Sequence, residues 1–153
     1  MSDSEIAGNI IQILAGLPEF LRKPMLKSRM TEFFTLPYEE KREMVTNALN
    51  AAPGIDLKVL GQLVKTWMEV LCEFEDGKRR DIFSVYAEAI ADSPDLLSKL
   101  ETGELVKIFD SLPAEKKDLL AGSLRDLVWN MPEQRRTSFL GAVPENAKKI
   151  LQL

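Results

Sequence analysis

Lysine and arginine recur along this chain at a regular spacing, in pairs or short runs that could hold an acidic partner or a phosphate backbone. They are Arg22-Lys23, Lys41-Arg42, Lys78-Arg79-Arg80, Lys99, Lys116-Lys117 and Arg135-Arg136. If the chain stacks similar units, these positions line up along one edge, which we call the basic ridge. The alternative is ion pairing within each helix, because acids such as Glu39, Asp76 and Glu133 lie three or four residues earlier.

Four carboxylates form an acidic patch at the expected end of one helix and the turn after it: Glu69, Glu73, Glu75 and Asp76. Carboxylates this close can bind a hard cation such as Mg²⁺ or Ca²⁺. Their spacing does not match the loop of a dedicated calcium site. We therefore expect exposed, solvated charge and no metal ligands here, with cation binding left open.

Eight side chains are candidates for contact with a partner. The expected anchors are Phe33, Phe34, Trp67 and Trp129, and the expected steering charges are Arg42, Arg79, Arg80 and Lys117. Aromatic and arginine side chains dominate the binding energy of many interfaces. Aromatic residues at helical spacing are also typical of a core, so both roles stay open for the four anchors.

The residue types that most enzymes need are scarce in this chain. Histidine is absent, which removes the commonest general base and metal ligand. The single Cys72 excludes an internal disulfide and a cysteine-rich zinc site. Neither a glycine-rich phosphate loop nor a nucleophile elbow occurs. We expect a protein that is not an enzyme and holds no cofactor.

Length and composition predict one folded domain, residues 1–153, in the cytoplasm. The net charge is −4 and the pI about 5.0, which argues against a chain built mainly to bind nucleic acid or an anionic membrane. No segment approaches the roughly eighteen apolar residues of a membrane span. The first residues are acidic, unlike a signal peptide, and a lone thiol suits a reducing compartment.

The elements that would position these residues are helices almost throughout. Apolar residues recur every three to four positions, and no β-branched run alternates with polar residues. Ser2 and Glu5 fit a capping box at the first helix. The expected helices cover residues 6–17, 18–34, 37–52, 56–72, 76–91, 94–100, 104–111 and 113–130, followed by short helices on either side of Pro144. Pro24 is expected to kink or split the second of them.

A step of about nineteen residues organises these helices. Leucine or methionine precedes proline at Leu17-Pro18, Leu36-Pro37, Leu112-Pro113 and Met131-Pro132, each followed by an acid. Proline suits a helix entrance, and the residue before it is pushed to the corner between helices. Doubling the step to 38 residues also aligns Met44, Ile82 and Leu120. The predicted fold is therefore an all-α, solenoid-like right-handed superhelix of about seven helix units, with a two-helix repeat of about 38 residues.

The steps Leu36-Pro37-Tyr38-Glu39-Glu40-Lys41-Arg42 and Leu112-Pro113-Ala114-Glu115-Lys116-Lys117 resemble those in the superhelical N-terminal domain of MgtE-type magnesium transporters. Related repeats occur in the flagellar motor switch protein FliG. The likeness extends over about residues 17–140. It implies a helical superhelix and, as one alternative, a regulatory domain that senses a divalent cation. The transporter's membrane part has no counterpart here, so transport is not implied.

Together these features favour a non-catalytic scaffold that binds a protein partner through a curved helical surface. A nucleic-acid-binding repeat that uses the basic ridge is the main alternative, but no aromatic residues interleave with the ridge for base stacking. An enzyme or small-ligand protein with a pocket between helices is another, and it predicts a closed cavity with inward-facing carboxylates.

Overall fold

We describe residues 3–153 of this chain in a computed structural model, which over that range contains helices and no strand. The helices are α1 (Asp3–Gly16), α2 (Glu19–Phe33), α3 (Tyr38–Ala51), α4 (Leu57–Leu71), α5 (Asp76–Asp92), α6 (Asp95–Ser98), α7 (Thr102–Asp110), α8 (Ala114–Asn130), α9 (Glu133–Ala142) and α10 (Glu145–Leu151), with a 3-10 turn η1 (Ala52–Gly54). The all-α prediction is confirmed for this range. Ser2 and the side chain of Glu5, which form the predicted capping box, lie outside the described part.

In six of the ten α-helices of the described range, proline is the residue just before the first helical turn, and one of the six, Pro94 before α6, already has helical backbone angles. Pro18, Pro37, Pro113, Pro132 and Pro144 have extended backbone, with ψ between 144° and 153°. Their carbonyl oxygens accept the first hydrogen bonds of the helix, as the Pro18 oxygen does from the Arg22 N–H at 2.8 Å. The predicted helix entrances are confirmed, because proline cannot continue a preceding helix but tolerates this position.

Pro24 does not split the helix that contains it. It lies inside α2, which continues from Glu19 to Phe33 without being split. Pro24 is exposed, and so is Phe20 one turn before it. On this side of the helix, water can replace the hydrogen bond that a proline removes from the carbonyl of Phe20.

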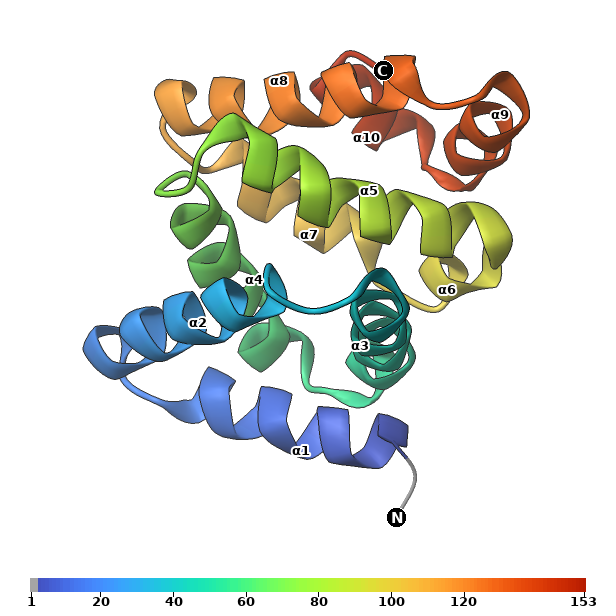
Figure 1. The fold of residues 1–153 in the computed structure, drawn as a ribbon. Coiled ribbons are helices and arrows are strands. Elements are labelled where there is room, and N and C mark those ends of the chain that lie inside the picture. Colours follow the sequence, from blue (N-terminus) through green and yellow to red (C-terminus); the bar gives the residue numbers. More distant parts are fainter. Residues whose placement is uncertain (1–2) are drawn as a thin grey trace.

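The helices follow one another from one end of the molecule to the other, and the two ends of the chain lie far apart (Figure 1). Helix α1 packs on α3 and α4, α3 packs on α5, and α5 packs on α8 and α9. Helix α10 packs on α7, which in turn packs on α4. Each helix therefore rests mainly on helices a few elements away in the chain.

One set of buried contacts occurs twice. In the first half, Arg22 Nε donates to Thr66 Oγ1 at 2.9 Å, and Arg22 Nη1 donates to the Leu17 carbonyl. In the second half, Arg79 Nε donates to Ser123 Oγ at 2.9 Å, and Arg79 Nη1 donates to the Phe74 carbonyl. Each residue lies 57 positions after its counterpart (79 minus 22, 123 minus 66, 74 minus 17). This spacing is three steps of nineteen residues, whereas the sequence alone favours two.

A continuous set of buried apolar side chains runs through the described chain, from Leu14 on α1 to Phe139 on α9. Val70, Leu71, Val85 and Val128 have no exposed surface. A smaller cluster of Ala52, Ile55 and Leu60 lies beside η1. No helix in the described range has both the length and the hydropathy that a membrane span requires.

Candidate functional site

An apolar hollow of about 210 Å³ opens between α4, α7, α8 and α10. Its main lining residues are Trp67 and Met68 from α4, Leu105, Val106 and Phe109 from α7, Leu120 and Leu124 from α8, and Ala147, Ile150 and Leu151 from α10. Phe83, Leu97, Thr102, Val143 and Pro144 complete the wall. Most of these side chains are only partly buried, so the hollow is a depression in the surface rather than a closed cavity.

Helical spacing and one proline explain how these side chains converge. Leu105 and Phe109 lie four residues apart on α7, as do Leu120 and Leu124 on α8 and Ala147 and Leu151 on α10. Each pair therefore shares one face of its helix. Pro144 ends the preceding stretch and starts α10, which then packs against α7.

Aromatic side chains form one edge of the hollow. The Trp67 ring meets the rings of Phe83 and Tyr86 edge to face, with centroids 6.1 and 5.5 Å apart. Such pairs favour these distances because the positive edge of one ring meets the negative face of the next. Burial raises the pKa of Tyr86 to about 12, so its hydroxyl stays protonated at neutral pH.

The chemistry of the hollow is binding by shape. No carboxylate, amine, guanidinium or thiol lines it, and its one polar lining residue is Thr102. It therefore offers no acid, base or charged group to a reacting substrate. Its volume is below the roughly 300 Å³ at which small-molecule and cofactor sites begin, which suits a few apolar side chains better than a whole ligand.

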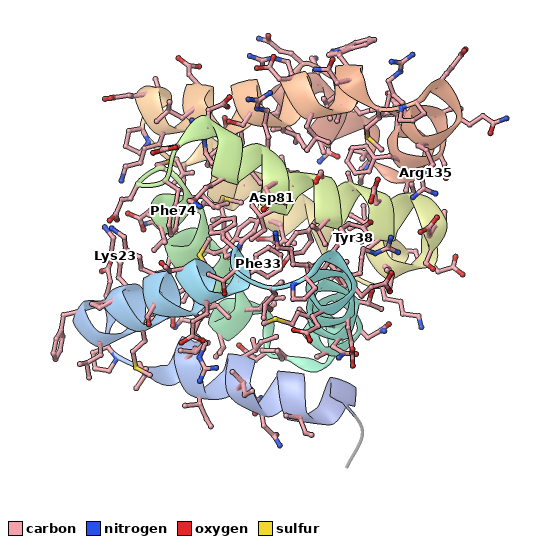
Figure 2. The ribbon with its side chains drawn as sticks, in the orientation of Figure 1. Lys23, Phe33, Tyr38, Phe74, Asp81 and Arg135 are labelled. Atoms are coloured by element: carbon pink, nitrogen blue, oxygen red, sulfur yellow. The ribbon has the colours of Figure 1, made fainter. Side chains whose placement is uncertain are left out.

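Of the four predicted aromatic anchors, the structure places Trp67 in the hollow. Phe33 is buried in the core near the middle of the molecule (Figure 2). The ring of Phe34 is half-buried, meets the rings of Phe33 and Phe74, and has the Lys78 ammonium 4.9 Å from its centroid. Trp129 is 59% exposed at the end of α8, with the Arg136 guanidinium 5.3 Å from its ring centroid. The four do not form one surface.

The predicted steering charges are also separated, and each has a partner within the chain. Arg79 is buried and donates hydrogen bonds to Ser123 Oγ and to the Phe74 carbonyl. Arg80 Nε lies 2.9 Å from Asp76, and Lys117 Nζ lies 3.4 Å from Asp110. Arg42 Nη2 donates to Asp92 at 2.9 Å.

Most ion pairs of the basic ridge join different helices. The pairs Lys41–Asp81, Arg42–Asp92, Lys116–Glu69 and Arg135–Asp92 cross from one helix to another. The Arg80–Asp76 pair, by contrast, lies within α5. The expectation that ridge residues pair inside their own helix is therefore wrong for these four pairs. Tertiary packing brings carboxylates of other helices within ion-pair distance of these cations.

Asp92 is the centre of a polar network that joins α3, α5 and α9. It accepts hydrogen bonds from Arg135 and Arg42, and the Tyr38 hydroxyl donates to Glu88 one turn earlier on α5. Figure 2 shows Tyr38 and Arg135 on the same side of the molecule, on either side of α5. The hydrogen bonds from Arg135 and then Arg42 lower the pKa of Asp92 to about 2. They also offset the unfavourable position of an acid at a helix C-terminus.

We expect Asp92→Asn to lower the free energy of unfolding at neutral pH by no more than about 1 kcal/mol, because solvent screens a carboxylate this exposed. Folding lowers this pKa from 3.8, so the stabilisation is present above 3.8 and is lost as the pH falls toward about 2. Urea unfolding across that range should therefore show a weaker pH dependence for Asp92→Asn than for the wild type. Asp118→Asn, at an exposed acid without an ion pair among the described contacts, is the control; an equal change there would contradict the role of Asp92.

Residues of the acidic patch form ion pairs with different lysine and arginine side chains of the chain. Glu73 contacts Lys23 and Lys27, Glu69 contacts Lys116, and Asp76 contacts Arg80 and accepts from Ser123. The hydrogen bonds from Lys27 and Lys23 lower the pKa of Glu73. Among the described residues, no group of three or more Asp, Glu or Cys is arranged to hold a metal ion. A second depression, beside Phe20, Lys23, Lys27 and Glu73, is wide and open to solvent.

Most residues that line the hollow were not among the predicted site residues; examples are Leu105, Val106, Leu124, Ile150 and Leu151. Their helical spacing is visible in the sequence, but the same spacing predicts a core residue equally well.

Comparison of the chain with protein-family models, curated proteins and solved structures finds no significant match in any of the three.

Proposed function

We propose that this protein is a non-catalytic scaffold that binds a partner protein by seating apolar side chains of an amphipathic helix in the apolar hollow. The observation that carries the proposal is a wall made almost wholly of apolar side chains, contributed mainly by four helices and left open to solvent. Helix-in-groove recognition uses such a surface, because apolar anchors at positions i, i+4 and i+7 of the partner replace water there.

Trp67 is the anchor of this surface on the scaffold side. Its ring lines the hollow and contacts the rings of Phe83 and Tyr86, so little conformational entropy remains to be lost on binding. Rigid aromatic side chains in such positions contribute a large share of binding energy. Phe33 and Arg79 are buried, and the proposal gives them a role in the core only.

Steering is assigned to Lys117 and Arg80, whose ammonium and guanidinium groups are partly exposed. Lys117 lies three residues before Leu120 and seven before Leu124, on the face of α8 that lines the hollow. An acid on the partner helix would compete with Asp110 for this ammonium. Charges at such a rim change association rates more than affinity.

The proposed architecture is a right-handed superhelix of stacked helical units in the cytosol. The contact set repeated at Arg22 and Arg79 supports stacking, and so does the packing of each helix on near neighbours in the chain. The repeat that these contacts favour is 57 residues long, rather than the two-helix unit of 38. The lone Cys72 suits the reducing cytosol.

Two alternatives have weaker support. A nucleic-acid-binding role needs free cations, and most of the basic ridge is already paired with carboxylates of the chain. A cation-sensing role, which the resemblance to the transporter domain implies, needs carboxylates that are free to converge on one ion. Glu69, Glu73 and Asp76 instead contact different cationic side chains.

The proposal is tested with Trp67 as a fluorescent reporter. Trp129→Phe removes the other tryptophan, and a displayed library of amphipathic helices is selected on this variant. Selected peptides should carry apolar residues at i, i+4 and i+7, and their titration should shift the emission of Trp67. We expect Ile150→Asp to weaken binding by about tenfold or more.

Leu119→Asp is the matched control, because Leu119 is as exposed as Ile150 but does not line the hollow. Equal losses from the two substitutions, or no selected helix, would contradict the proposal. Binding of an oligonucleotide that weakens steeply with salt would favour the nucleic-acid alternative instead.

A further inference from the structure

The first helices of the chain leave a row of apolar side chains exposed. Ile6, Ile10 and Ile13 lie four and three residues apart and share one face of α1. Leu21 and Met25, four residues apart, are exposed on α2, which packs beside α1. We call these five residues the N-terminal face.

For Ile13 and Met25, the corresponding positions later in the chain are buried, whereas those of Leu21 are Lys78, which is exposed, and Arg135, which is half-buried. Ile13 is 65% exposed, whereas Val70, 57 residues on, is 0% exposed and Leu127, a further 57 on, is 9% exposed. Met25 is 43% exposed, whereas Ile82 and Phe139, at the same intervals, are 4% and 6% exposed. At Ile13 and Met25, exposure is therefore a property of the first unit and not of these two positions in general.

Helices from the preceding part of the chain pack on the helices that carry these later positions, in addition to helices that follow them. Helix α4, which carries Val70, packs on α1 and α2, and α5, which carries Ile82, packs on α3. Helices α8 and α9, with Leu127 and Phe139, both pack on α5. The N-terminal face is thus a surface of the kind that helices cover elsewhere in this chain, and within residues 3–153 no helix precedes it.

The opposite end of the chain is a poor cover for this face. Arg125 Nη1 on α8 donates a hydrogen bond to the Leu151 carbonyl at 3.1 Å. At the end of α10, the Leu153 N–H donates to the Lys148 carbonyl at 2.9 Å. The exposed residues of α8 include Asp118 and Asp126, which a covering helix would have to desolvate. A head-to-tail chain of copies is therefore disfavoured.

We propose that the N-terminal face binds the same face of a second copy, so that the protein forms a two-fold symmetric dimer. A surface that pairs with itself is the usual basis of a symmetric homodimer. No charged residue occurs between Ile6 and Gly16, so this stretch of α1 can pair with the same stretch of a second copy without burying a charge. The proposal does not depend on the apolar hollow.

The test is the oligomeric state of the full chain by sedimentation velocity and equilibrium, up to roughly 100 µM. The wild type should be a dimer. Ile13→Glu and Met25→Glu should each raise the dimer dissociation constant by on the order of thirtyfold or more, because a charge would be buried at the centre of the interface. Both positions are exposed in the single chain, so each variant should keep the helical circular dichroism of the wild type.

Leu119→Glu, on α8 at the other end, is the control and should leave the dimer unchanged. A monomeric wild type at the highest concentration would overturn the proposal. So would a dimer that survives Ile13→Glu, or one that Leu119→Glu dissociates.

Discussion

Arg79→Ala is expected to lower the free energy of unfolding by about 3 kcal/mol. The buried guanidinium donates to Ser123 Oγ at 2.9 Å and to the Phe74 carbonyl, so it ties α5 to α8 and to the turn before α5. Alanine would leave that carbonyl without this donor in a place that water reaches poorly, and it would leave a space in the core. Urea unfolding with linear extrapolation measures the change.

Arg80→Ala is the control for this prediction. Arg80 follows Arg79 directly but is exposed, and its ion pair joins it to Asp76 within α5. Such a pair contributes at most about 0.5 kcal/mol. Arg79→Lys should recover little, since one ammonium cannot replace the forked donor geometry of a guanidinium. Equal effects of Arg79→Ala and Arg80→Ala would contradict a structural role for Arg79.

Leu71→Ala is expected to cost about 3 kcal/mol or more. Leu71 ends α4 and has no exposed surface, and it lies in the continuous core of the described chain. Removing its side chain leaves a cavity among side chains that cannot collapse fully around it. The loss should appear in global unfolding and as faster amide hydrogen exchange in helices on both sides of α4.

Leu14→Ala probes the corresponding position 57 residues earlier, on α1. Leu14 is buried too, but α1 is the first helix of the described chain. If each helix is stabilised mainly by contacts with its neighbours, the effect of Leu14→Ala should stay local. Amide hydrogen exchange should then become faster in α1 to α3 and change little in α8 to α10. Faster exchange throughout the molecule after Leu14→Ala would contradict stacking and indicate one cooperative unit.

The helices were predictable because their signals are local. Each predicted helix from residue 18 to residue 130 starts and ends within one or two residues of the structure. A proline restricts its own backbone and that of the residue before it, so Leu17, Leu36 and Leu112 lie at corners as expected. Pro24 does not split α2, an outcome that depends on whether the freed carbonyl meets water or protein.

The spacing of the two equivalent sets of contacts was less predictable than the nineteen-residue step. A nineteen-residue step is visible in the prolines, but the sequence does not say how many steps make one unit. The paired contacts of Arg22 with Thr66 and of Arg79 with Ser123 indicate three steps. These contacts join residues 44 positions apart, a distance over which no local pattern operates.

Burial separates residues that look alike in the sequence. Arg79 and Arg80 are neighbours of one type, yet the first is buried against α8 and the second is exposed. Phe33 and Trp67 are both aromatic residues at helical spacing, yet Phe33 fills the core while Trp67 lines the hollow. The sequence therefore supplied the list of candidates, and the packing of helices decided which of them reach a surface.

The amino-acid sequence by itself determined that residues 3–153 of this protein are helical, where most of the helices begin and end, and which residue types the chain lacks. Those properties follow from backbone restrictions and side-chain spacing that act within a turn or two of a helix. The apolar hollow, the Asp92 network and the exposed N-terminal face were decided by tertiary structure alone. Each depends on which helices meet, and that is set by the burial of side chains many positions apart in the chain.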